Sequence, residues 1–163
     1  MVKMILCIDK NGNIGKDNDL LFHMKEDMQF FRKSTTGSTV IMGYNTWLSL
    51  GKKPLPNRFN VVLTNEEIND VERTMSTNNL EEIIDIIKKA SWEDIYIIGG
   101  AYVYNYALAN NLVDEILITI VPTVVEDADT RVNMELAKDF NKKEILKIFE
   151  YNEMKVTIES WKK

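Results

Sequence analysis

The sequence predicts an α/β fold: a mostly parallel central sheet flanked by helices on both faces, with a C-terminal antiparallel hairpin. Short apolar runs typical of buried strands alternate along the chain with segments that have helical periodicity. Because parallel strands must be joined by a crossover, usually a helix, this alternation favours a parallel sheet. At the C-terminus, Met154, Val156 and Ile158 alternate with polar residues, which indicates a strand with one exposed face. The run 145–151 precedes that strand across a short polar connection, so a hairpin is expected there.

The first half of the chain begins with a strand and a turn-rich stretch. Residues 2–8 are apolar except for Lys3, as in a buried strand, and residues 9–19 contain Gly12 and Gly15, as in turns. Residues 24–34 repeat apolar side chains every three and four positions, which predicts a helix. After this helix we expect a strand over 39–42 that ends at Gly43, a short helix with Trp47 and Leu50, and a strand over 60–64.

The second half continues the alternation. Leu80, Ile83, Ile84 and Ile87 form one apolar stripe, so residues 80–89 are expected to form an amphipathic helix. A strand over 94–98 stops at Gly99-Gly100, a helix is expected over 101–108, and an apolar strand over 115–121. The sequence has no internal repeat and no Pro- or Gly-rich linker, which favours one domain over 1–163.

Composition and charge exclude several classes of protein. The 163 residues are 45% hydrophobic and 28% charged, which is typical of a globular domain. With 20 Lys and Arg against 25 Asp and Glu, the formal charge is −5, which argues against nucleic-acid binding through charge. One Cys and one His exclude a disulfide framework and argue against a metal site. No run approaches the roughly 20 apolar residues of a membrane span, so a cytoplasmic protein without a membrane partner is expected.

Asp27 is the most informative candidate. It lies on the apolar stripe with Met24, Met28 and Phe31 rather than on the charged face of its helix. An ionised carboxylate in a medium of low dielectric constant is costly unless it is paired or hydrogen-bonded, so Asp27 needs a partner. One interpretation is a structural carboxylate bonded within the protein. The other is a carboxylate at the floor of a pocket that holds an amidine-like edge of a heterocycle through two parallel hydrogen bonds.

Two strand–glycine–helix junctions are candidate phosphate sites. Gly99-Gly100 lies between a strand and a helix, and Gly43 occupies the same kind of position. Glycines allow a backbone to approach a ligand closely, and the amides at a helix start favour phosphate, so the two junctions suggest a ligand with several phosphates, such as a dinucleotide. The spacing G-x-G-x-x-G is absent, and many glycine pairs only turn the chain.

Three further side chains have two interpretations each. Arg58 is either a solvated loop charge or a guanidinium that holds a substrate carboxylate. Cys7 lies in a buried strand and is interpreted as a small core residue rather than a nucleophile. His23 precedes a helix and is interpreted as a solvated loop residue.

Together these segments resemble the dihydrofolate reductase family, of the bacterial type. The matching residues occur in the family's order along nearly the whole chain. They are Ile14-Gly15 with Asn18, Asp27 with Phe31, VIMGYNTW over 40–47, PLPNR over 54–58, IYIIGG over 95–100 with Tyr104, Thr119, and Glu126 with Asp129-Thr130.

The resemblance implies hydride transfer from NADPH to C6 of 7,8-dihydrofolate, which gives tetrahydrofolate for one-carbon metabolism and thymidylate synthesis. Asp27 would hold the pterin 2-amino group and N3 and favour protonation at N5, with a hydrogen bond from Thr119. Arg58 would pair with the glutamate α-carboxylate. Further substrate contacts would come from Ile5, Leu6, Met28, Phe31, Leu50, Leu55 and Ile98. Dihydrofolate and antifolates are the expected partners, and a monomer is expected.

The resemblance also implies a cofactor site. The loop over 11–22 would close over the nicotinamide, which places Leu20 and Phe22 with Asp27 at the catalytic centre. Gly99 and Gly100, which the family typically joins by a cis peptide, would lie beside the cofactor. The full set of cofactor residues would be Cys7, Ile14, Gly15, Asn18, Leu20, Gly43, Tyr44, Asn45, Thr46, Leu63, Thr64, Asn65, Ile98, Gly99, Gly100, Ala101, Tyr102, Val103 and Tyr104.

Three departures from the family pattern carry expectations of their own. Leu21-Phe22 replaces the usual Pro-Trp, so no indole N–H is available to anchor a water. Arg131-Val132-Asn133 replaces the usual Phe-Pro after Thr130. The family's basic phosphate contacts correspond here to Tyr44, Asn45, Asn78 and Tyr102, although Thr64 and Asn65 can still donate to a 2′-phosphate. Charge-assisted hydrogen bonds are roughly twice as strong as neutral ones, so a reduced preference for NADPH over NADH is expected.

Two alternatives remain open at this point. One is a related nicotinamide-dependent reductase that acts on another heterocycle, such as a flavin-pathway pyrimidine; Asp27, Phe31 and Arg58 favour folate instead. The other is a folate- or nucleotide-binding protein that has lost turnover. Binding without oxidation of the reduced cofactor would distinguish it.

Overall fold

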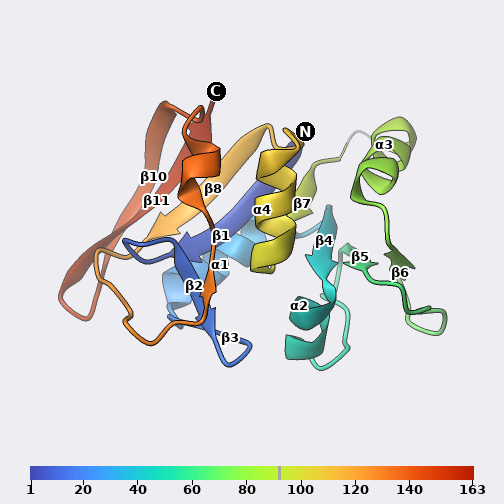
Figure 1. Ribbon diagram of the computed structural model, residues 1–163, viewed down its shortest axis with the longest axis horizontal. Helices are drawn as coiled ribbons and strands as arrows, with labels where there is room; N and C mark the ends of the chain where they lie inside the picture. The colour runs from blue at the N-terminus through green and yellow to red at the C-terminus, as the bar shows by residue number, and fades with distance from the viewer. Residues whose placement is uncertain (92) are drawn as a thin grey trace.

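The computed structural model describes residues 1–91 and 93–163. Eight strands form one sheet in the order β10-β11-β8-β1-β7-β4-β5-β6 (Figure 1). Every neighbouring pair from β8 to β6 is parallel, and β10 and β11 are joined antiparallel to the β8 edge. The strands are β1 (Val2–Ile8), β4 (Thr39–Gly43), β5 (Phe59–Leu63), β6 (Thr74–Thr77), β7 (Ile95–Ile97), β8 (Glu115–Ile120), β10 (Lys142–Tyr151) and β11 (Met154–Lys162). The predicted mostly parallel sheet and its C-terminal hairpin are thus confirmed.

Helices cover both faces of the sheet, as the sequence predicts. They are α1 (Lys25–Thr35), α2 (Tyr44–Ser49), α3 (Leu80–Ala90) and α4 (Ala101–Ala109). Figure 1 shows α4 on the near side of the sheet and α1 on the far side. Because successive strand residues point to opposite faces, β1 divides its side chains between two core clusters. Met4 and Leu6 pack with residues of α3 and α4, whereas Ile5 packs with residues of α1 and α2.

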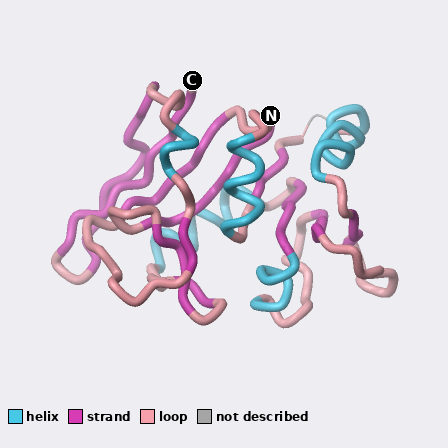
Figure 2. Tube along the Cα trace, in the orientation of Figure 1, coloured by secondary structure: helices cyan, strands magenta, loops and turns pink. Residues whose placement is uncertain are grey.

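A second, small sheet occupies the turn-rich stretch that follows β1. It consists of β2 (Asn13–Lys16), β3 (Asp19–Leu20) and β9 (Thr130–Arg131), in the order β3-β2-β9. The segment between β8 and β9 is loop (Figure 2). The sequence prediction missed this sheet, β6 and a short 3₁₀ helix, η1 (Met134–Ala137), because segments of two to four residues are too short to show a period.

The parallel strands bring separate sequence motifs to one edge of the sheet. Their carboxyl ends lie on the same side, so the residues after β1, β4, β5 and β7 converge there. These residues are Asp9, Tyr44, Thr64 and the Gly99-Gly100 pair. A ligand-binding site is therefore expected at this edge of the sheet.

The described residues, 1–91 and 93–163, contain neither a membrane-spanning helix nor a cluster of metal ligands. No helix in this part of the chain is long and apolar enough to cross a membrane. No group of three or more His, Cys, Asp and Glu side chains there could hold a metal ion.

Candidate active site

Asp27 lies in the first turn of α1, which packs against the sheet face that Ile5 and Thr119 share. Its carboxylate is half-buried and accepts a hydrogen bond from the Thr119 hydroxyl, with 2.5 Å between Oγ1 and Oδ1. Thr119 is buried in β8, 92 positions further along the chain. Burial raises the pKa of Asp27, and the bond from Thr119 partly opposes that rise. The donor that the sequence required for Asp27 is therefore present, and within residues 1–91 and 93–163 no further group donates a hydrogen bond to its Oδ2.

An apolar wall lies beside this carboxylate. Of the predicted substrate residues, Ile5, Phe31, Leu50, Leu55 and Ile98 belong to one core cluster. The wall combines residues of β1, α1, the end of α2 and the end of β7 with the loop before β5. Such a wall suits the flat face of an aromatic heterocycle.

Two predicted substrate residues lie apart from that wall. Leu6 packs in the cluster with α3 and α4, because it follows Ile5 in β1 and therefore points to the opposite face. Met28 is 56% exposed on α1, so its side chain extends into solvent.

Arg58 is buried, at 4% exposure, and the interpretation as a solvated loop charge is wrong. Its Nε donates to the Pro56 carbonyl at 2.9 Å, and its Nη1 donates to the Thr35 hydroxyl at 2.9 Å. Burial lowers the pKa of the guanidinium, and the nearby charge of Arg32 adds to this effect. Among the described residues, none bonds to Nη2, and no fully buried side-chain nitrogen lacks a partner. Nη2 is therefore held in place by the bonds of its neighbours and is not completely buried.

The two glycine junctions meet at the carboxyl edge of the sheet. The Gly43 amide donates to the Gly99 carbonyl at 2.7 Å, and the Gly99-Gly100 peptide is cis, as the resemblance implies. A side chain at Gly43 would come within 3.0 Å of Val103, and Gly99 has a φ of 122°. The positive φ favours glycine at position 99, and any larger residue at position 43 would require Val103 to shift. Together the two junctions place two buried glycines and the half-buried Gly100 directly before α4.

Tyr104 fastens α4 to the first strand. It is buried, and its hydroxyl donates to the Ile5 carbonyl at 2.7 Å. Burial raises the pKa of this phenol, with smaller contributions from Asp27 and Cys7. Since the Tyr104 ring also lies against Gly99, its contribution to a cofactor site is to hold the glycine pair in place.

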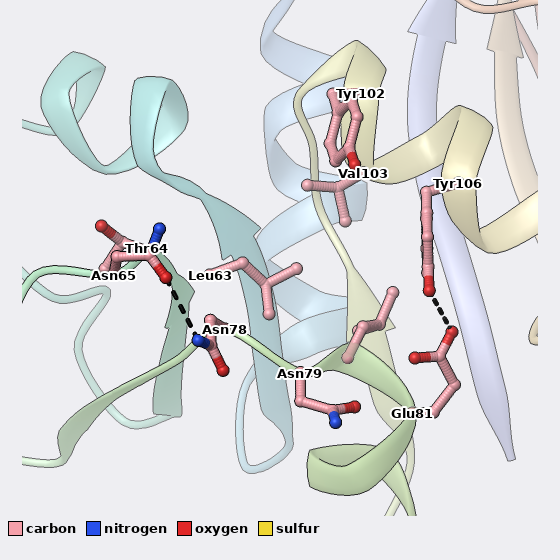
Figure 3. Close-up of a pocket in the computed structure, with 10 residues that line it drawn as sticks. Leu63, Thr64, Asn65, Asn78, Asn79, Glu81, Tyr102, Val103 and Tyr106 are labelled. Atoms are coloured by element: carbon pink, nitrogen blue, oxygen red, sulfur yellow. Dashed lines mark hydrogen bonds between the residues drawn. The ribbon is translucent and has the colours of Figure 1, made fainter.

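A groove of about 520 Å³ continues from this edge, between α3, α4 and the ends of β5 and β6 (Figure 3). Five of the predicted cofactor residues line it: Leu63, Thr64, Asn65, Tyr102 and Val103. The other lining residues are Asn78, Asn79, Leu80, Glu81 and Tyr106. Of these, Asn78 was singled out from the sequence, and the others were missed.

The missed residues have ordinary structural explanations in the sequence. Asn79 caps α3 by accepting from the Glu82 amide at 3.0 Å, and Leu80 belongs to the apolar stripe. Glu81 is an acidic residue in the first turn of a helix, where it is favourable without any ligand. Tyr106 follows Tyr102 by one helical turn, and that spacing was the only available signal.

The start of α2 also lies beside the glycine pair. Thr46 Oγ1 is 3.4 Å from the position that a side chain at Gly99 would occupy. The Tyr44 hydroxyl donates to Glu66 at 2.9 Å, and Asn45 is exposed. Ala101, the first residue of α4, is half-buried.

The loop over 11–22 carries the predicted lid residues. Asn18 is exposed, with a φ of 61°, and Leu20 is 56% exposed, so both lie at the surface. The Gly15 carbonyl accepts from the Asp129 amide at 3.1 Å, and the Asp17 amide donates to the Asp129 carboxylate at 2.9 Å. The loop is thereby held against the segment that precedes β9.

Other residues near the loop face the protein interior. Ile14 packs against the core cluster on the α4 side of the sheet. Phe22 packs with Cys7 in a third cluster and meets Tyr151 edge-on at 6.3 Å between ring centroids. Burial raises the pKa of the Cys7 thiol, which agrees with a small core residue rather than a nucleophile.

His23 is exposed, with Nε2 at 3.5 Å from the Asp19 carboxylate, which agrees with the interpretation of His23 as a solvated loop residue.

Comparisons with known proteins identify a family for this chain. A model of the dihydrofolate reductase family matches residues 1–163. The dihydrofolate reductase of Bacillus subtilis is 38% identical over 104 residues, which are 64% of this chain and 60% of that protein. The enzyme of Ureaplasma parvum is 38% identical over 110 residues, 67% of this chain and 69% of that protein.

A solved structure has the same fold. It is the dihydrofolate reductase from Enterococcus faecalis complexed with NADP(H) and RAB-propyl, with a TM-score of 0.77 and 24% identity. The alignment covers 99% of this chain and 95% of that chain. On the match of the family model to the whole chain, the protein belongs to the dihydrofolate reductase family.

Proposed function

We propose that this chain reduces 7,8-dihydrofolate to 5,6,7,8-tetrahydrofolate with NADPH as hydride donor. The observation that carries the proposal is the Asp27 carboxylate, held by Thr119 at 2.5 Å on an otherwise apolar face. Its Oδ2 side is suited to the amidine-like edge formed by the 2-amino group and N3 of a pterin, which offers two parallel donors. Membership of the dihydrofolate reductase family supports the same substrate.

Asp27 is the group that favours protonation of the bound pterin. As a carboxylate in a poorly solvated position, it stabilises positive charge on the bound pterin more strongly than it would in water. Protonation of N5 is thereby favoured, with the proton delivered through an intervening water. Thr119 is a positioning residue, because its hydroxyl fixes the orientation of the carboxylate and stabilises the ionised form.

Arg58 and the apolar wall hold the rest of the substrate. The Nη2 edge pairs with the α-carboxylate of the glutamate, while Thr35 and Pro56 keep the guanidinium in place. Phe31, Leu50 and related wall residues pack on the pterin and benzoyl rings. Anchoring both ends fixes the substrate over the reacting edge.

The residues at the sheet edge fit a nicotinamide dinucleotide. Gly99 and Gly100 carry no side chain that could fill the space beside them, and the groove beyond them accommodates a further part of the ligand. When bound, the reduced nicotinamide supplies the hydride that C6 of the pterin accepts. Leu20 and Phe22 belong to the loop that closes this site and excludes water.

The test is dihydrofolate-dependent loss of the absorbance of reduced nicotinamide. Turnover that disappears in Asp27→Asn, while the variant stays folded, supports the proposal. Absence of turnover combined with an antifolate that still raises the melting temperature would overturn it in favour of a folate-binding protein. Turnover with a flavin-pathway pyrimidine but not with dihydrofolate would point to the other reductase.

We also propose a single-domain monomer over 1–163 that acts in the cytoplasm on dihydrofolate, with antifolates as competing ligands and without nucleic-acid or membrane partners. The formal charge of −5 and the absence of a basic run support the exclusion of nucleic acid. Sedimentation equilibrium tests the monomer, and a dimer at micromolar concentration would contradict it.

A further inference from the structure

The groove between α3 and α4 has an unusual charge for a site that receives a phosphorylated dinucleotide. None of its ten lining residues is Lys, Arg or His, and the one ionisable carboxylate among them is Glu81. Its neutral polar groups are Thr64, Asn65, Asn78 and Asn79, together with two tyrosines. A phosphate dianion is held best by cations or by several free donors. The groove offers no cation and places a negative charge beside the ligand.

Glu81 is fixed in an orientation that leaves an acceptor available. The Tyr106 hydroxyl donates to Glu81 Oε1 at 2.5 Å (Figure 3). Within the described part of the chain, Oε2 accepts no protein hydrogen bond. A carboxylate with one free oxygen is a good acceptor for a ribose hydroxyl and repels a phosphate at the same place.

Two tyrosines provide an aromatic surface beside this carboxylate. Tyr102 and Tyr106 lie one helical turn apart on α4, with ring centroids 6.2 Å apart and an interplanar angle of 25°. Tyr102 is 80% exposed, so much of its ring is uncovered. An uncovered tyrosine ring offers a stacking surface for a nucleobase, independent of ligand charge.

The side-chain donors that the groove offers to a 2′-phosphate are all uncharged. Asn78 Nδ2 donates to Asn65 Oδ1 at 3.1 Å, so part of this amide is already engaged. Thr64 Oγ1 accepts from the Glu66 amide at 3.1 Å, which leaves its hydroxyl hydrogen free to donate. The groove can therefore donate only neutral hydrogen bonds to a 2′-phosphate, opposite the charge of Glu81.

We propose that this groove recognises the adenosine half of the dinucleotide through base stacking and ribose hydroxyls, with Glu81 as a specificity-determining residue. The chain consequently uses NADH about as well as NADPH. This inference rests on the proposed function, since it assumes that the dinucleotide extends from Gly99-Gly100 into the groove. Each charge-assisted hydrogen bond to a phosphate contributes roughly ten- to one-hundredfold in affinity, and this discrimination is missing here.

The experiment compares kcat/KM and Kd for NADH and NADPH in the wild type and in two variants, Glu81→Gln and Glu82→Gln. Glu82 is the matched control, because it is exposed in the same turn of α3 and does not line the groove. We expect a wild-type NADPH to NADH ratio within about tenfold of one, since no cation contributes. Glu81→Gln should tighten NADPH binding roughly three- to tenfold through loss of repulsion and weaken NADH binding slightly, and the control should change neither.

A third variant introduces the missing charge. Asn78→Lys should raise the ratio by roughly ten- to one-hundredfold through a new charge-assisted bond, with NADH nearly unchanged. A wild-type ratio above about one hundred, or equal effects of Glu81→Gln on both cofactors, would overturn the inference.

The two proposals fail in different ways. Turnover of dihydrofolate with a strong NADPH preference keeps the proposed function and refutes the role of Glu81. Similar Kd values for NADH and NADPH without turnover keep the inference and refute the reductase. Kd values are measured by quenching of tryptophan fluorescence, so the inference is decided in either case.

Discussion

Replacement of Asp27 by Asn removes one charge and almost no volume. The Thr119 hydroxyl can still donate to the amide oxygen, so the local packing is expected to persist. What is lost is the negative charge that stabilises the protonated pterin. A positioned acid–base group contributes roughly 10²–10⁴-fold to the rate, so kcat/KM at pH 7 should fall by that factor, about 2.7–5.5 kcal/mol.

The same substitution has an opposite effect on stability. Burial raises the pKa of Asp27, so the folded state binds a proton more readily than the unfolded chain does. The wild-type free energy of unfolding should therefore gain a contribution as pH falls through the folded-state pKa towards the ordinary value of 3.8. The Asn variant lacks this contribution and should be at least as stable as the wild type at pH 7.

The assay combines kinetics and unfolding for both proteins. Reduced-nicotinamide absorbance gives kcat/KM between pH 5 and pH 8, and urea titration gives the free energy of unfolding. In the variant, kcat/KM should rise as pH falls, because the proton must then come from solvent. A variant with kcat/KM within about tenfold of the wild type at pH 7, and an unchanged pH profile, would refute the assigned role.

Three further substitutions test the roles of Arg58, Thr119 and Asp9. Arg58→Leu should weaken dihydrofolate binding by about 1.5–3 kcal/mol in calorimetry, and should leave the affinity for a pterin without the glutamate unchanged. Thr119→Val should move the acidic limb of the kcat/KM profile to higher pH, because its hydroxyl lowers the pKa of Asp27. Asp9→Ala should lower the free energy of unfolding at pH 7 by roughly 1–3 kcal/mol, measured in urea, because this fully buried carboxylate accepts four hydrogen bonds. Burial alone would raise the pKa of Asp9, but bonds from Val125 and Asn13 lower it, so the difference should shrink as pH falls through the folded-state pKa.

Each of these three predictions can be contradicted by a specific result. Equal losses for substrates with and without the glutamate would assign Arg58 a structural role only. An unshifted profile in Thr119→Val would mean that the hydroxyl does not act through Asp27. A constant stability difference between pH 7 and pH 3 in Asp9→Ala would show that the charge of this carboxylate is not involved.

Regular elements with a clear period were predictable from the sequence. The strands β1, β4, β5 and β8 and the helices α1 and α3 are long enough for apolar spacing to reveal them. The small sheet was not, because β2 and β9 are short and lie more than one hundred residues apart in the chain. Pairing over that separation depends on the position to which the loop after β8 carries β9. No local sequence pattern encodes that position.

Some residues of the candidate site were likewise predictable from the sequence, and others were not. Asp27 attracted attention from its position on an apolar stripe, and the glycine junctions from their place between strand and helix. The sequence could not decide between the two interpretations of Arg58, because burial of a loop residue depends on the helix packed against it, here through Thr35. Leu6 was included with Ile5 although the alternation of a strand sends their side chains to opposite faces.

Sequence alone therefore determined the fold class, the elements with a clear period and, through the resemblance, the ordered set of motifs around Asp27. Tertiary structure alone decided that Glu81 and Tyr106, from two different helices, meet in the groove that is proposed to receive the cofactor. The physical reason is that periodicity and turn chemistry are local, since they follow from backbone geometry over a few residues. Burial, local charge and hydrogen-bond partners depend on side chains that packing brings together. The net charge and the free donors of a groove are therefore defined only once the chain has folded.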